Sequence, residues 1–149
     1  MRNQSHAMAP DRIMLVRSSW PAVARQADGL TTRFYAILFE IDPSAARLFT
    51  GVDMAAQRTK LAQALAVVVH ALDDLDRLLP PLAALGKRHA HYGVGHHHFD
   101  SVGAALVQSL GETLGDEFTP ELQAAWTEAY GLVAAVMRRA LLTCQTGTG

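Results

Sequence analysis

The spacing of the apolar residues restricts the fold of this chain more than any other feature. From Ile13 to Leu141, segments rich in Ala and Leu repeat apolar residues every three or four positions. That spacing places them on one face of an α-helix. No stretch alternates apolar and polar residues with enrichment in Val, Ile or Thr, as a half-buried strand does. The sequence therefore predicts an all-α protein with six main helices plus short turns.

Prolines and capping residues set the expected limits of these helices. Pro21 lies inside the first apolar stripe, where it should kink or divide the helix. Asp42-Pro43 should end the second helix, because a residue before proline avoids the helical region. Asp53 and Thr119 are the expected N-caps of two later helices. The expected segments start at about Pro10 and continue as Asp28–Ile41, Ser44–Phe49, Asp53 to about Leu72, Pro80 towards His91, His98–Leu114 and Pro120 through Met137.

The 149 residues fit one domain, 1–149, with residues 1–9 and 143–149 expected to fray. The formal net charge of −1 provides no basic field, so neither nucleic acid nor a membrane is an expected partner. Cys144 has no second cysteine to pair with, and the first residues lack the apolar stretch of a secretory signal. The most apolar run, Leu61–Leu72, is too short to span a bilayer. We therefore expect a cytoplasmic protein.

Histidines dominate the residues that could carry chemistry, and five of the seven lie between positions 89 and 98. They fit either a surface metal site built from several imidazoles or a single haem ligand with solvated neighbours. Zinc is the less favoured alternative, because no cysteine is near and the successive residues His96, His97 and His98 should point in different directions. We expect these three to be the solvated start of a helix.

The region Leu85-Gly86-Lys87-Arg88-His89, followed by Tyr92-Gly93-Val94 and Phe99-Asp100-Ser101-Val102-Gly103, resembles the proximal-histidine region of neuroglobin-like and bacterial single-domain globins. Three further motifs in the same order extend the resemblance from about Asp11 to Leu141. They are Ser18-Ser19-Trp20, the second-helix pattern from Phe34-Tyr35 to Leu48-Phe49, and Ala125-Trp126 with Tyr130-Gly131. The resemblance implies a globin fold around one pocket for haem b.

Two polar residues match the distal side of this family. Gln57 stands thirty-two residues before His89, the separation that these globins show between the distal residue and the iron ligand. Tyr35 matches the corresponding position of the second helix. This Tyr and Gln pair resembles the globin part of bacterial flavohaemoglobins. Without the resemblance, we would expect the Tyr35 hydroxyl on a backbone carbonyl and Gln57 in solvent.

The resemblance assigns His89 as the only protein ligand of the iron on the proximal side. Leu61 and Leu65 lie four and eight residues beyond Gln57, on the same helix face, and Leu61 also lines the distal side. Lys60 is the candidate partner of a haem propionate, with an ordinary solvated lysine as the alternative. The remaining expected haem contacts are Phe49, Leu85, Val94, Phe99 and Val102.

The sequence departs from flavohaemoglobins on the proximal side. Phe99 and Leu141 occupy the positions of a tyrosine and a glutamate that increase electron donation by the histidine in that family. The Gly-rich phosphate loops of flavin and nicotinamide domains are also missing, so electrons would come from a separate reductase. We therefore expect reversible oxygen storage, transport or delivery first, and nitric oxide dioxygenation or nitrite reduction second. A gas sensor ranks third, and a metal-binding module based on the histidine cluster ranks fourth.

Overall fold

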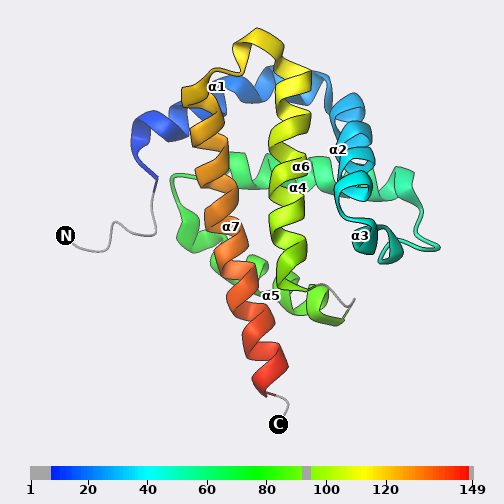
Figure 1. Cartoon of the computed structure of the whole chain (residues 1–149). Coiled ribbons are helices and arrows are strands. Elements are labelled where there is room, and N and C mark those ends of the chain that lie inside the picture. Colours follow the sequence, from blue (N-terminus) through cyan, green and yellow to red (C-terminus); the bar gives the residue numbers. More distant parts are fainter. Residues whose placement is uncertain (1–7, 92–94, 148–149) are drawn as a thin grey trace.

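A computed structural model describes residues 8–91 and 95–147, without the side chains of 86–91 and 141–147. All regular elements in these ranges are helical, which confirms the all-α prediction (Figure 1). The α-helices are α1 (Pro10–Arg25), α2 (Ala27–Ile41), α3 (Pro43–Arg47), α4 (Met54–His70), α5 (Leu79–His91), α6 (His96–Leu114) and α7 (Pro120–Gly147). Short 3₁₀ helices are η2 (Leu75–Arg77) and η3 (Gly115–Glu117). Six of the α-helices are long, and α3 is the short turn expected after Pro43.

Helices α6 and α7 run antiparallel at the front of the molecule in Figure 1, joined through η3 at the top. Helix α7 packs along both α5 and α6, and α2 packs along α6 from the other side. Helix α4 crosses behind α6 and α7, where it contacts α1 and α2. Helices α2 and α4 are thereby held against each other, and they carry the two polar residues of the expected distal side.

Local sequence explains where several helices begin and end. The Asp53 carboxylate accepts hydrogen bonds from the backbone N–H groups of Ala55 and Ala56 at 3.1 and 3.3 Å, which confirms the expected N-cap of α4. Thr119 Oγ1 accepts from the Leu122 N–H at 3.1 Å at the start of α7. Helix α6 ends at Gly115, whose φ of +58° lies in the left-handed region that favours glycine.

Pro21 does not divide α1, contrary to one of the two outcomes expected from the sequence. The helix continues to Arg25 even though proline removes one backbone donor. Val16 and Val23, on either side of Pro21, are buried at 0 and 1% exposure. Their packing in the core outweighs the local cost of proline and keeps the chain helical.

The structure describes only residues 8–9 and 143–147 of the two segments expected to fray, so the fraying stays a prediction. Helix α7 is helical through Gly147, into the segment 143–149 that the sequence marked as a tail. At the other end, Met8 is buried at 4% exposure and belongs to the core. None of the helices in the described part of the chain is both long and apolar enough to cross a membrane.

Two apolar clusters fill the interior of the part of the chain that the structure describes. The main cluster joins α1, α2, α4, α6 and α7, and Trp126 at 3% exposure ties α7 to α1 through a 3.0 Å bond from Nε1 to Ser19 Oγ. The second cluster lies where α5, α6 and α7 meet. Its buried members are Ala71, Leu78, Leu82, Phe99, Ala134 and Met137.

Candidate functional site

Tyr35 on α2 and Gln57 on α4 contact each other directly. Gln57 Nε2 donates a hydrogen bond of 3.2 Å to the Tyr35 phenol oxygen. Tyr35 is buried at 6% exposure, and Gln57 is half-buried rather than solvated. Among the described residues, no backbone carbonyl accepts the Tyr35 hydroxyl. The structure therefore brings together the two polar residues that the sequence assigned to the distal side.

The environment of Tyr35 keeps its phenol protonated. Burial disfavours the charged phenolate and raises the pKa of Tyr35 above its usual value of 10.0, while the hydrogen bond from Gln57 acts weakly in the opposite direction. In the hydrogen bond from Gln57, the phenol oxygen is the acceptor. Among the described residues, none accepts a hydrogen bond from the phenol O–H. At neutral pH, Tyr35 is a buried, neutral group with one hydrogen left to donate.

Aromatic rings surround this phenol. The Phe34 ring meets the Tyr35 ring edge-on at a centroid distance of 4.9 Å, and the Phe49 ring does so at 5.4 Å. The Phe39 ring lies 5.8 Å from Tyr35 and 5.5 Å from Phe49. Edge-on contacts at these distances are favourable between aromatic rings. Phe49, an expected haem contact, thus belongs to the wall around Tyr35.

Helix α4 supplies the aliphatic part of the same region. Leu61 and Leu65 are half-buried and pack against the main cluster, on the helix face that carries Gln57. Lys60, one residue before Leu61, is exposed. Its role as a propionate partner stays a prediction, as does the alternative of a solvated lysine.

The expected proximal residues are described only in part. Position 89 lies in α5 as the sequence predicted, but the side chain of His89 lies outside the described residues, and Val94 does so entirely. Leu85 is half-buried against the second cluster, and Phe99 is buried in it at 5% exposure. Val102 packs against the main cluster. The side chain of Leu141 also lies outside the described part.

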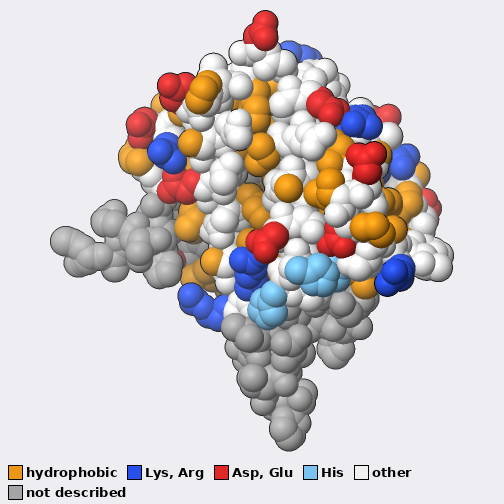
Figure 2. Space-filling view, in the orientation of Figure 1, with side chains coloured by type: hydrophobic (Ala, Val, Ile, Leu, Met, Phe, Trp, Pro, Cys, Tyr) orange, Lys and Arg blue, Asp and Glu red, His pale blue; other side chains and the backbone are white. Residues whose placement is uncertain are grey.

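The expectation for the three successive histidines is wrong for one of them. Histidine side chains reach the surface shown in Figure 2, and His96 and His97 are exposed, but His98 is buried at 7% exposure. Its Nδ1 accepts a 2.8 Å hydrogen bond from the Gly95 N–H, as a side chain at the third helical position does in a capping box. The rings of His97 and His98 also lie 3.9 Å apart rather than pointing in different directions.

Sequence reasoning also missed the polar network around His98. Its Nε2 lies 3.0 Å from Ser44 Oγ, which donates to Asp42 Oδ1 at 2.5 Å, and Ser101 Oγ donates to Asp42 Oδ2 at 2.7 Å. These two hydroxyl donors, together with the nearby histidines, lower the pKa of Asp42 to about 2. The local signal was limited to Asp42 and Ser44, which stand two residues apart at the corner between α2 and α3.

Comparison with known proteins agrees with these features. The sequence pattern of the globin family matches residues 32–137. The flavohemoprotein of Bacillus subtilis is 31% identical over 124 residues and that of Chromobacterium violaceum is 34% identical over 122 residues, covering 82 and 80% of this chain. The chain spans only 31 and 30% of the length of these two relatives.

Solved structures give the same result. An engineered carbene transferase, described as a putative nitric oxide dioxygenase from Rhodothermus marinus, superposes with a TM-score of 0.86 at 27% identity, covering 95% of this chain and 99% of that one. A bacterial globin from Campylobacter jejuni superposes with a TM-score of 0.82 at 22% identity, over 92 and 99% of the two chains, and supports the fold alone. A family pattern over most of the chain and helices that superpose on those of a bacterial globin lead to one conclusion: this chain belongs to the globin family.

Proposed function

We propose that this globin binds haem b through His89 and holds oxygen reversibly beside Tyr35 and Gln57. The observation that carries the proposal is the 3.2 Å contact between the phenol and the amide, which come from different helices and meet in a buried region. Such a contact is expected if the two residues act on one ligand. It is not expected if they were an isolated core aromatic and a solvated glutamine.

The residues around Tyr35 fit an apolar cofactor and a small uncharged ligand. The described side chains that contact Tyr35 are aromatic, apart from the neutral amide of Gln57, and aliphatic Leu61 and Leu65 lie on the same face of α4 as Gln57. When bound, the haem would supply an iron that can hold a diatomic gas. A glutamine at position 57 lacks the imidazole that would compete for that position, so we expect the reduced, ligand-free protein to be penta-coordinate.

The distal pair favours oxygen over carbon monoxide by hydrogen bonding. Oxygen held in the pocket carries partial negative charge, and the free hydrogen of the Tyr35 phenol is a donor for it. Gln57 positions that phenol, and its amide is the second donor within reach. Carbon monoxide polarises less and gains less from the same two groups. The desolvated surroundings strengthen each hydrogen bond and keep the phenol neutral.

The proximal side favours binding over oxygen activation. A neutral His89 ring would donate its other N–H to a carbonyl near Leu85 in α5, which fixes the ring without adding negative charge. Phe99 offers no polar side-chain atom. Tyr130 does not replace the missing tyrosine, because its hydroxyl donates to the Phe99 carbonyl oxygen at 2.7 Å. Without a carboxylate partner, His89 would be a weaker electron donor.

Nitric oxide dioxygenation is the second candidate function. It is favoured by relatives named flavohemoprotein and by a structural neighbour described as a putative nitric oxide dioxygenase. On this chain it would need electrons from a separate reductase. The protein would then bind its haem and its gas ligand in the cytoplasm, and the separate reductase would act on it there.

Paired rate measurements distinguish the two functions. Oxygen association and dissociation are followed by stopped flow, and nitric oxide consumption is followed with an electrode in the presence of a supplied flavin reductase. Slow oxygen release with little catalysed consumption of nitric oxide supports storage or delivery. Sustained consumption of nitric oxide at the rate of reductant supply would instead support dioxygenation. A protein that takes up no haem would exclude both functions.

A further inference from the structure

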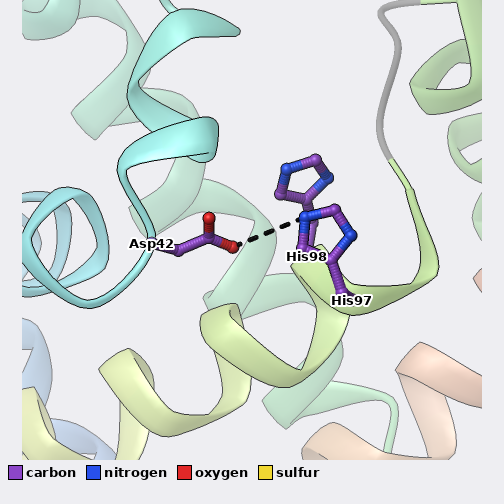
Figure 3. Close-up of side chains that lie close together, drawn as sticks. All are labelled: Asp42, His97 and His98. Atoms are coloured by element: carbon purple, nitrogen blue, oxygen red, sulfur yellow. Dashed lines mark ion pairs between the residues drawn. The ribbon is translucent and has the colours of Figure 1, made fainter.

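A second group of polar side chains lies where the corner between α2 and α3 meets the start of α6 (Figure 3). Asp42 comes from the corner, and His97 and His98 come from the first turn of α6. One ligand atom from each of the three side chains lies within 4.8 Å of the other two. The His97 Nε2 atom is 3.9 Å from Asp42 Oδ2.

The three ligand groups lie around one point, which is occupied by the hydroxyl oxygen of Ser44. Ser44 Oγ lies 2.5 Å from Asp42 Oδ1, 3.2 Å from His97 Nε2 and 3.0 Å from His98 Nε2. Three groups of metal-ligand chemistry therefore face a common centre. We propose that Asp42, His97 and His98 form a binding site for a borderline divalent transition-metal ion, with Zn²⁺ as its representative.

The ligand types select the class of ion. Two imidazole nitrogens and one carboxylate oxygen suit Zn²⁺ and its neighbours, whereas Ca²⁺ and Mg²⁺ prefer oxygen ligands alone. Ser101 Oγ donates to Asp42 Oδ2 at 2.7 Å and orients the carboxylate, as groups behind a metal ligand commonly do. The His97 side chain is 64% exposed, so an ion has access from solvent. Water would complete the tetrahedron.

Metal binding requires a change in which ring nitrogen of His98 carries the proton. Because the Gly95 N–H donates to Nδ1, the proton of the neutral His98 ring is on Nε2, directed at Ser44. An ion at Nε2 requires that proton to move to Nδ1, which ends the hydrogen bond from Gly95. The Ser44 hydroxyl must also turn aside, because its oxygen lies between the three ligand groups. Binding therefore competes with existing contacts, which lowers the affinity for the ion.

The test titrates ZnCl₂ into the haem-loaded protein, without a polyhistidine tag, by isothermal calorimetry at pH 7.5. We expect one ion per chain. At a hundredfold excess over the dissociation constant, the melting temperature should rise by about 5–10 °C. His97→Gln removes one ligand from an exposed position and should weaken binding at least about tenfold. The matched control is His96→Gln, which changes the neighbouring exposed histidine and should leave the affinity unchanged.

Two further variants separate ligation from folding. Asp42→Asn keeps the shape of the side chain but weakens its ligation, so it should also lower the affinity. Ser44→Ala removes the hydroxyl at the centre and should leave binding intact or strengthen it. The proposal is overturned if Zn²⁺ produces no binding heat, if His97→Gln binds as tightly as the parent, or if His96→Gln or His91→Gln is as damaging as His97→Gln.

Discussion

Replacing Tyr35 with phenylalanine removes one oxygen atom from a position buried at 6% exposure and leaves the ring packed against Phe34 and Phe49. The change deletes the free phenol hydrogen and also the acceptor of the 3.2 Å bond from Gln57. A hydrogen bond to a partly charged ligand contributes roughly 1.5–3 kcal/mol. Since about 1.4 kcal/mol corresponds to a factor of ten, oxygen dissociation should accelerate about ten- to a hundredfold.

The assay is stopped-flow displacement of oxygen, with carbon monoxide dissociation measured on the same samples. Carbon monoxide dissociation should change far less, because that ligand accepts a weaker hydrogen bond. Tyr130→Phe is the matched control, since it removes a phenol hydroxyl that bonds to a backbone carbonyl instead. It should leave oxygen dissociation nearly unchanged. An unaltered oxygen rate in Tyr35→Phe would show that the phenol points away from the ligand, and the distal assignment would fail.

Three further predictions concern pH and stability. Because burial raises the pKa of Tyr35 above 10.0, the phenol stays protonated, and oxygen dissociation measured by stopped flow should stay constant from pH 7 to 10. The contribution of the protonated Tyr35 to the free energy of unfolding is present below pH 10 and is lost as the pH rises beyond it. Gly103→Ala would place Cβ 2.9 Å from the Tyr130 ring and should cost about 1–3 kcal/mol in urea unfolding, whereas Gly131→Ala has open space and should add about 0.5–1 kcal/mol. Arg17→Met removes the side-chain donors to the Val69 and His70 carbonyls at the end of α4, and it should lower the free energy of unfolding by about 1–3 kcal/mol. The control Arg12→Met, at an exposed ion pair, should lower it by about 0.5 kcal/mol or less. Equal losses for the two arginine variants would show that capping of α4 contributes nothing.

Helix positions were predictable from the sequence because their causes are local. The caps at Asp53 and Thr119 follow from residues two or three positions away. The uninterrupted course of α1 past Pro21 was not predictable in this way, since it depends on Val16 and Val23 packing against other helices. Where a local preference competes with tertiary burial, the sequence pattern alone does not show which effect dominates.

The candidate site shows the same division. Tyr35 and Gln57 are 22 residues apart on different helices, so no spacing rule pairs them. Their pairing came from the family resemblance, and the structure places them in contact. The burial of His98 was missed because its partners come from the distant corner at Asp42 and Ser44. A run of three histidines resembles a solvated helix start until the opposite surface is known.

Reversible oxygen binding to haem is measured by the absorption spectrum of the reduced protein, cycled between argon and air. Under argon we expect the Soret band of a penta-coordinate ferrous haem. In air it should shift to an oxygenated spectrum, and it should return under argon over repeated cycles. His89→Ala should fail to retain haem in the same measurement, while His91→Ala should behave as the parent. A parent protein without a Soret band, or one whose band depends on His91 rather than His89, would show that this chain does not hold haem through His89.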